Sequence, residues 1–482
     1  MYVCVNVSSH IHDSPFLSKK EIHRVIMLKL EYLLFFTMGM GVLFPWNAII
    51  TAIDYFESLY EVSLSTNVDT ISIVHLLRTI TINKNNVQDI NIELYFSVSY
   101  TWSLLISMIL ALMFKSLTSN RVMMFAGYIT MMIVLLLFLC VSDPSVELST
   151  FLAVIVGMGD AMAQSGLFAY AATTDSLYTS AVMAGNGTAG LIVGALRLLT
   201  KWAFYNTSEN ALYKSSRVYF AVCVFVILCA ICSLHTLTSK TSFSSVDHLG
   251  DCQRLRDEDE RDVEDEKNET SSATTVQPFD AILPGSQVTA DQKQHSLIET
   301  VVLTFTRVRR LAAEASTYLI AMFCIFLITL ALFPAIMVEI QSSSNLGDWW
   351  SVILIVIFNL FDTIGRTSFS SSLVRERLEL WIKGNDRKLL VLVLSRALYV
   401  PLFWLCVKPD VLGNDILVIL IVSTFALSNG VLSTYIITVG SNSFKDDRDK
   451  ETVSNLIVLS LMFGLAVGSV FGVGLEALIR WV

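Results

Sequence analysis

Three polar residues in one apolar segment have the types and the spacing needed to bind hydroxyl groups. Asn359, Asp362 and Arg366 follow one another at steps of three and four residues, so a helix places them on one face. A charged side chain inside a bilayer costs about 2.5 to 3.5 kcal/mol, and the charges that remain there are functional candidates. The Asp and the Arg neutralise each other and still offer an acceptor and a guanidinium fork to neighbouring hydroxyls. The alternative is a structural clamp that binds no ligand.

A second polar group lies in residues 157–166. Asp160 and Gln164 are four residues apart and share a helical face. A primary amide donates and accepts hydrogen bonds at once, which suits the edge of a nucleobase. Helix packing through hydrogen bonds is the alternative role for Gln164. For Asp160 the alternatives are a residue that supports this site and an unpaired carboxylate that carries protons.

A third group combines a ring with an amide at the adjacent residues Pro45, Trp46 and Asn47. Proline bends a helix and removes a backbone donor, which frees backbone groups beside the indole and the amide. Trp46 lies about seventeen residues into its apolar segment, away from the ends where aromatic anchors gather. This position favours a side chain that lines a cavity, with Asn47 in support.

The sequence offers no convincing residues for dinucleotide binding, metal binding or catalysis. Gly185, Gly187 and Gly190 have the spacing of a dinucleotide-binding motif, but no strand precedes them, so close helix packing explains them better. The same explanation applies to the four-residue glycine spacing within residues 464–472. None of the seven histidines falls in the core of a predicted helix, and no nucleophile and base pair stands out. We therefore expect no catalytic residue, no metal site and no cofactor.

The elements that position these residues follow from the composition, which is 54% hydrophobic and only 16% charged. A soluble domain is about 45–50% apolar and about 25% charged, so soluble enzymes, disordered chains and disulfide scaffolds are excluded. A helix needs about 20 apolar residues to cross a bilayer. The sequence predicts an all-α polytopic membrane protein with eleven transmembrane helices, at residues 30–52, 94–114, 122–142, 150–173, 178–200, 218–237, 315–337, 350–372, 388–407, 415–439 and 452–478.

The net charge of -9 belongs mostly to one segment. Residues 238–300 hold 14 Asp and Glu against 6 Lys and Arg, and the segment is too polar to fold by itself. We expect a disordered cytoplasmic loop, which serves either as a solvated tether or as a regulatory segment. The predicted order is a cytoplasmic N-terminus (1–29), a six-helix bundle (30–237), the acidic loop (238–312) and a five-helix bundle (313–482). No basic patch indicates nucleic-acid binding.

The distribution of Lys and Arg predicts the orientation. With the N-terminus in the cytoplasm, 18 of the Lys and Arg residues near helix ends lie inside and 8 lie outside, as the positive-inside rule favours. The C-terminus is then outside, and so is Asn206, which opens an Asn-Thr-Ser acceptor site for glycosylation.

Taken together, these motifs resemble those of the equilibrative nucleoside transporters, and they run in order across nearly the whole chain. The matching segments are residues 41–56, 164–168, 183–187, 219–220, 333–339, 358–366, 401–403 and 428–430, with Tyr178, Gly190 and Arg396. The resemblance implies eleven helices in a six-plus-five arrangement, similar to the major facilitator architecture with one helix missing.

The resemblance also implies roles for the candidate residues. Trp46 and Gln164 match residues that meet the base of a nucleoside, and Asp362 and Arg366 match the pair that meets the ribose hydroxyls. Asn47 and Asn359 then line or brace the cavity. At Asp160 many family members have a small residue, so inhibitor sensitivity cannot be carried over.

The predicted function is facilitated diffusion of purine and pyrimidine nucleosides, with nucleobases as further substrates, by a multi-pass protein of the plasma membrane that is not an enzyme. The two halves rock about a midplane site, with the glycine-rich helices at 178–200 and 452–478 as sliding surfaces. The alternative is a proton-coupled symporter that uses Asp160 or Asp362. The partners are the substrate and the lipid bilayer, without nucleic acid or metal; the oligomeric state is left open.

Overall fold

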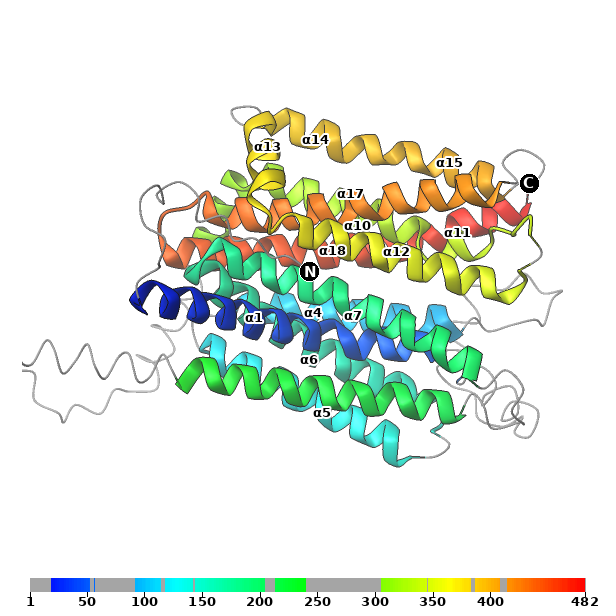
Figure 1. Cartoon of the computed structure of the whole chain (residues 1–482), viewed down its shortest axis with the longest axis horizontal. Coiled ribbons are helices and arrows are strands. Elements are labelled where there is room, and N and C mark those ends of the chain that lie inside the picture. Colours follow the sequence, from blue (N-terminus) through cyan, green and yellow to red (C-terminus); the bar gives the residue numbers. More distant parts are fainter. Residues whose placement is uncertain are drawn as a thin grey trace, which may run out of the picture.

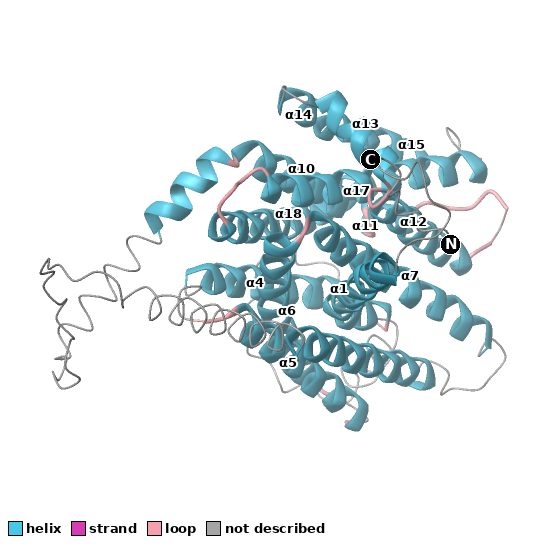
Figure 2. Ribbon diagram, turned by 60° about the vertical axis from the view of Figure 1, so that its left-hand side comes forward, coloured by secondary structure: helices cyan, strands magenta, loops and turns pink. Residues whose placement is uncertain are grey.

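The computed structural model describes residues 19–52, 56, 92–113, 118–141, 144–203, 213–239, 305–344, 346–382, 386–407 and 414–481. Most of the predicted acidic loop, most of the N-terminal segment and the acceptor Asn206 lie outside these residues. Within them every regular element is a helix and no strand is present (Figure 2). The helices are α1 (Lys19–Thr51), α4 (Ile92–Met113), α5 (Asn120–Cys140), α6 (Val146–Thr174), α7 (Ser176–Ala203), Tyr213–Ser239, α10 (Ser316–Leu332), α11 (Ala335–Val338), α12 (Asp348–Ser368), α13 (Ser372–Ile382), α14 (Asp386–Leu394), η2 (Ser395–Leu398), α15 (Tyr399–Val407), α17 (Asp415–Asn442) and α18 (Asp447–Trp481).

The prediction of eleven membrane spans is confirmed, because the described chain contains 11 helices that are long and apolar enough to cross a bilayer. Their outer faces are apolar, as a lipid environment requires. Phe225 is 66% exposed, Leu420 56% and Ile133 52%. The first span starts at one end of the bundle and the last finishes at the other (Figure 1). Which end faces the cytoplasm stays a prediction.

Several helix ends follow from local chemistry. Ser119 and Ser145 accept hydrogen bonds from backbone N–H groups in the first turns of α5 and α6, and Asn414 does the same for α17, which satisfies donors that have no partner inside the helix. α18 starts five residues before the predicted span, at Asp447, because acidic residues are favourable in the first turn of a helix.

Two spans differ from the continuous helices that the sequence predicted. The span 387–407 contains a 3₁₀ turn, Ser395–Leu398, between α14 and α15. The segment predicted as 350–372 ends as α12 at Ser368, and the separate helix α13 follows. Both Figure 1 and Figure 2 place α13 and α14 at the edge of the bundle.

The helices form two groups that pack side by side. α1, α4 to α7 and Tyr213–Ser239 make the N-terminal group, and α10 to α18 make the C-terminal group (Figure 1). The groups meet mainly where α7 packs on α12 and where α18 packs on α4 and α6. The exact boundaries predicted for two bundles stay a prediction, since the loop between the groups lies outside the described residues.

The glycine motif of α7 is a packing surface. A Cβ atom at Gly185 would lie 2.1 Å from Phe36 O of α1, and one at Gly187 would lie 2.8 Å from Arg366 Cδ of α12. At Gly190 the nearest atom is Asn359 Oδ1, at 2.7 Å. These contacts confirm that the motif serves close packing, and they leave α7 in contact with both groups.

The glycines of α18 correct one expectation. A Cβ atom at Gly464 would lie 2.6 Å from Phe323 O, and one at Gly468 would lie 2.8 Å from Leu327 O. Both carbonyls belong to α10, which is in the same group as α18. The expectation that these glycines form a sliding surface between the halves is therefore wrong, because they join two helices of one half.

The two groups also touch at both ends of the bundle. Near the start of α7, Ser370 Oγ lies 2.8 Å from Ser180 Oγ and 3.2 Å from Tyr32 OH. Near the far end of α7, the Lys201 ammonium lies 5.2 Å from the centre of the Trp349 ring. Polar contacts thus join the two groups at both ends.

The packing of α7 on α1 predicts the effect of adding one methyl group. Gly185→Ala should lower the free energy of unfolding by about 1–3 kcal/mol, because overpacking against a backbone carbonyl forces the helices apart. Gly474→Ala is the matched control, since nothing lies within 4 Å of its added Cβ. Thermal unfolding in detergent measures both variants. Equal melting temperatures would contradict the tight contact.

Candidate functional site

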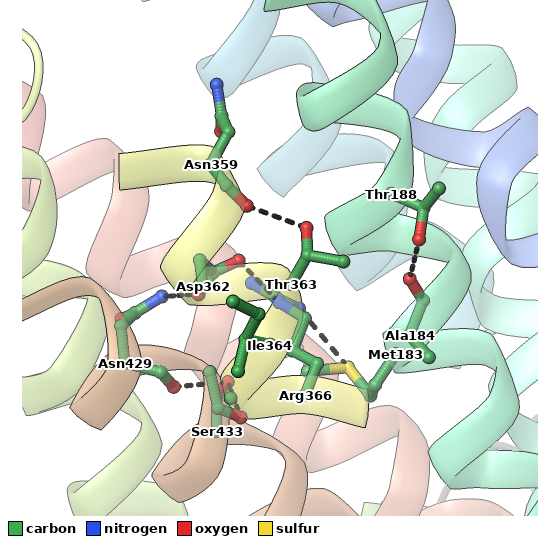
Figure 3. Close-up of polar contacts among 12 residues, drawn as sticks. Met183, Ala184, Thr188, Asn359, Asp362, Thr363, Ile364, Arg366, Asn429 and Ser433 are labelled. Atoms are coloured by element: carbon green, nitrogen blue, oxygen red, sulfur yellow. Dashed lines mark hydrogen bonds and ion pairs between the residues drawn. The ribbon is translucent and has the colours of Figure 1, made fainter. Parts of the chain in front are cut away.

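The polar centre of the C-terminal group is the Asp362–Arg366 pair of α12. The two side chains are almost fully buried, at 5% and 7% exposure. Arg366 Nε donates to Asp362 Oδ2 at 2.6 Å, and Asn429 Nδ2 of α17 donates to Asp362 Oδ1 at 2.8 Å (Figure 3). The predicted pairing of these charges is confirmed. Both carboxylate oxygens hold a donor, and each retains a lone pair for a further one.

A chain of hydrogen bonds extends from this pair to a second buried arginine. Asn429 Oδ1 accepts from Thr329 Oγ1 of α10 at 2.8 Å, and Thr329 Oγ1 accepts from Arg396 Nη2 at 2.8 Å. Arg396 Nη1 also donates to Ser428 Oγ at 2.6 Å. The chain therefore connects α10, α12, α17 and the 3₁₀ turn that carries Arg396.

Arg396 has no acidic neighbour within ion-pair distance in the described part of the chain. It is 2% exposed, and its guanidinium lies 4.7 Å from the centre of the Phe425 ring. A buried cation is stable only if its donors are satisfied or a counter-charge lies near. Neutral oxygens at Nη1 and Nη2, an aromatic face and the more distant Asp362 carboxylate provide most of that environment, whereas the buried Nε has no hydrogen-bond partner in the described residues.

The Asp362–Arg366 pair keeps one donor group for a ligand. Arg366 Nη1 lies 3.8 Å from Met183 Sδ of α7, across the interface between the groups. Within the described residues, Arg366 Nη2 has no hydrogen-bond partner. It is also not one of the fully buried polar atoms. This nitrogen is therefore not completely enclosed, and its N–H groups remain free to donate to a hydroxyl oxygen.

The polar centre of the N-terminal group is the carboxylate of Asp160 in α6, which is fully enclosed. Gln164 Nε2 donates to Asp160 Oδ1 at 3.0 Å, and the Tyr100 hydroxyl of α4 donates to Asp160 Oδ2. The structure thus brings Asp160 and Gln164 together, as their spacing predicts. The interpretation of Asp160 as an unpaired carboxylate is wrong, because Tyr100 approaches from another helix.

Trp46 joins this cluster through a ring contact. Its indole stacks on the Tyr100 ring, with centres 3.9 Å apart and planes inclined by 6°. Gln164 is only 4% exposed. Its Oε1 accepts no hydrogen bond from the described residues and is not completely enclosed. The cluster therefore presents an aromatic face and an amide oxygen.

The two predicted supporting asparagines each contact a nearby helix backbone. Asn47 Nδ2 donates to Leu43 O of its own helix at 2.9 Å. Asn359 Oδ1 faces Gly190, and its amide nitrogen points away from the Asp362–Arg366 pair (Figure 3). Asn359 thus braces α12 against α7. No hydrogen bond or ring contact links the Trp46 cluster directly to the Asp362 pair in the described chain.

Comparison with known proteins now identifies the fold's family. A family model described as "Nucleoside transporter" matches residues 150–477. The chain belongs to the nucleoside transporter family. Its relatives include equilibrative nucleotide transporter 1 of Arabidopsis thaliana, 28% identical over 91% of this chain and 84% of that protein. Equilibrative nucleoside transporter 1 of Rattus norvegicus is 24% identical over 94% and 98% of the two chains. These relatives are transporters, in agreement with the prediction that the chain is not an enzyme.

A solved structure supports the expected architecture. The human organic anion transporter MFSD10 (TETRAN) matches with a TM-score of 0.51 and 12% identity, over 95% of this chain and 98% of that one. At this identity the likeness shows the fold alone. It confirms the predicted similarity to the major facilitator architecture.

Sequence reasoning about this transporter missed four residues of the polar networks: Tyr100, Thr329, Arg396 and Asn429. Arg396 and Asn429 were noticed only within motifs, although a charge and an amide in apolar spans are signals of their own. Thr329 and Tyr100 gave no such signal, since a Thr bonds to its own helix and an aromatic residue is common in membrane spans.

The Arg396 chain predicts a strict need for a guanidinium. Arg396→Lys should destabilise the protein by about 1.5–3 kcal/mol, because an ammonium cannot reach Thr329 and Ser428 together. Thermal unfolding in detergent measures the loss, and Arg377→Lys on α13, which is exposed, is the control. If both variants melt alike, the chain does not hold these helices.

Proposed function

We propose that this transporter moves nucleosides across the membrane by facilitated diffusion, with the base at the Trp46 cluster and the ribose at the Asp362–Arg366 pair. One observation carries the proposal. Each helix group contributes one buried polar cluster, and each cluster keeps a hydrogen-bonding atom that is not completely enclosed, Gln164 Oε1 in one and Arg366 Nη2 in the other. Family membership supplies the substrate class.

The chemistry of the two clusters matches the two parts of a nucleoside. A base is flat and apolar on its faces, which suits the Trp46 ring, and its edge carries donors and acceptors that suit the Gln164 amide. Ribose hydroxyls donate to a carboxylate and accept from a guanidinium, and the Asp362–Arg366 pair offers both. Because the pair is neutral in sum, it fits a neutral substrate. Nucleobases lack the ribose and would use the first cluster alone.

Transport requires the two groups to separate at one end while they stay closed at the other. The contacts described above suit this exchange. The hydroxyl junction of Ser370 with Ser180 and Tyr32 lies at one end, and the Lys201–Trp349 contact lies at the other. At the first end Asn120 Nδ2 of α5 also donates to Glu451 Oε1 of α18 at 2.7 Å, so this bond too must break when the groups separate there.

A proton-coupled mechanism gains no support from the relatives, whose names describe equilibrative transport. Two carboxylates were suggested for that role. Asp160 accepts hydrogen bonds from Tyr100 and Gln164, and Asp362 accepts them from Arg366 and Asn429. We further propose that the N-terminus is cytoplasmic, that the protein resides in the plasma membrane, and that Asn206 is glycosylated.

The function is tested by counterflow in reconstituted vesicles. Vesicles loaded with unlabelled nucleoside should transiently accumulate labelled nucleoside without a proton gradient, because a facilitator exchanges substrate across its alternating states. Asp362→Asn and Arg366→Ala should each reduce this exchange by about ten- to a hundredfold, since a hydrogen bond to a charged group contributes about 1.5–3 kcal/mol. Labelled-nucleoside uptake measures both effects.

The control for those variants is Arg377→Ala, which removes an exposed arginine from α13. It should exchange nucleosides like the unaltered protein, and all variants must be incorporated into vesicles equally. Normal exchange by Asp362→Asn or Arg366→Ala would mean that the pair is only a structural clamp. Absence of counterflow in the unaltered protein would reject the proposed function.

The hydroxyl junction predicts that a disulfide cross-link at this end stops nucleoside uptake reversibly. In the double variant Ser180→Cys with Ser370→Cys, the two sulfurs replace oxygens that lie 2.8 Å apart, a separation from which a disulfide forms with little movement. Oxidation should stop nucleoside uptake, and a reductant should restore it. Each single variant, oxidised in the same way, is the control. Full uptake by fully cross-linked protein would contradict opening at this end.

A further inference from the structure

We propose that Asp160 determines base specificity as a positioning residue. It fixes the amide of Gln164 so that the carbonyl oxygen meets the base, and the transporter thereby selects bases that carry an N–H donor at that edge. The inference rests on the proposed function, in which Gln164 meets the base. It goes further, because it states which end of the amide the substrate meets and which side chain decides it.

The buried carboxylate of Asp160 determines which groups can face it. Asp160 is completely buried, and in the described part of the chain no Lys, Arg or His lies within ion-pair distance of it. When Asp160 is ionised, its negative charge is therefore balanced only by neutral donors. An ionised carboxylate is an acceptor at both oxygens, so the groups that face it must present hydrogens. At Oδ1 that group is the amide nitrogen of Gln164, 3.0 Å away.

The Asp160 carboxylate fixes the orientation of the Gln164 amide. If Gln164 turned over, its carbonyl oxygen would face Asp160 Oδ1, and two acceptors would meet in an enclosed site without a hydrogen between them, which is unfavourable. The orientation with Nε2 toward Asp160 is therefore strongly preferred. It leaves Oε1, which is not completely enclosed, as the atom presented to a ligand.

Tyr100 forms a hydrogen bond to the other oxygen of the Asp160 carboxylate. Its hydroxyl donates to Asp160 Oδ2 and its ring stacks on Trp46. The nearby Tyr128 does not compete for Asp160, because its hydroxyl donates to Met38 O at 2.7 Å. One carboxylate thus sets both the position of the aromatic platform and the polarity of the amide.

The ligand class follows from the Gln164 carbonyl oxygen. A carbonyl oxygen accepts from an exocyclic amine or a ring N–H, as adenine, cytosine, guanine, hypoxanthine and uracil provide. Purine riboside has the same ring system and ribose as adenosine but lacks the amine. A site built to accept a hydrogen bond disfavours an analogue without the donor, because its own acceptor stays unpaired.

The experiment compares the transport efficiency, kcat/KM, of adenosine with that of purine riboside in vesicles that contain the full chain. The unaltered protein should prefer adenosine by about tenfold, the effect of about one hydrogen bond. In Asp160→Asn the new amide can donate to Gln164 Oε1, which lets the glutamine turn and present its N–H. The ratio of the two kcat/KM values should fall to about one or reverse.

Two further variants separate positioning from general damage. Asp160→Gly removes the carboxylate without adding bulk and should also reduce the preference to about one. Tyr100→Phe removes only the Oδ2 hydrogen bond, so its preference should stay near that of the unaltered protein. In a Gln164→Ala background, Asp160→Asn should no longer change the ratio, because Asp160 acts through the Gln164 amide.

The outcomes distinguish this inference from the function on which it rests. Unchanged preference in Asp160→Asn and Asp160→Gly, with transport intact, would overturn the inference and leave the proposed function standing. The same holds if Asp160→Asn changes the ratio equally with and without Gln164, or if the unaltered protein does not prefer adenosine. Absence of nucleoside counterflow in the unaltered protein would instead reject the proposed function.

Discussion

The charge of Asp362 is the constraint on which the C-terminal group depends. This one buried carboxylate pairs with Arg366 directly and with Arg396 through Asn429 and Thr329. Removing one member of a buried charged network leaves the others uncompensated in a medium of low polarity. The helices that carry the network must therefore keep their positions relative to one another. Rigidity inside the group is what allows the group to move as one body against its neighbour.

The position of α7 depends on the absence of side chains at a few of its residues. Gly185 allows contact with the backbone of α1, and Gly187 allows contact with Arg366. With side chains at both positions α7 would have to move away from one neighbour. The helix therefore packs tightly against α1 of its own group and against α12 of the other group.

Sequence patterns predicted what local periodicity controls. The spans follow from runs of apolar residues, and the pairs Asp160–Gln164 and Asp362–Arg366 follow from spacings of four residues on a helix. Contacts between helices were not accessible in this way. The approach of Tyr100 to Asp160 depends on how α4 packs on α6, and the glycines of α18 gave no indication that they face α10. The 3₁₀ turn Ser395–Leu398 was missed because the prediction of a span uses the length of its apolar run, which does not report the backbone geometry inside it.

The hydroxyl junction of Ser370 with Ser180 and Tyr32 has a consequence for the populations of conformational states. Three neutral hydroxyls contribute little net free energy, because water replaces each partner when the groups part. A minor state that lies only a few kcal/mol higher remains populated at roughly 0.1–10%. The carrier then reverses direction whenever the concentration gradient does.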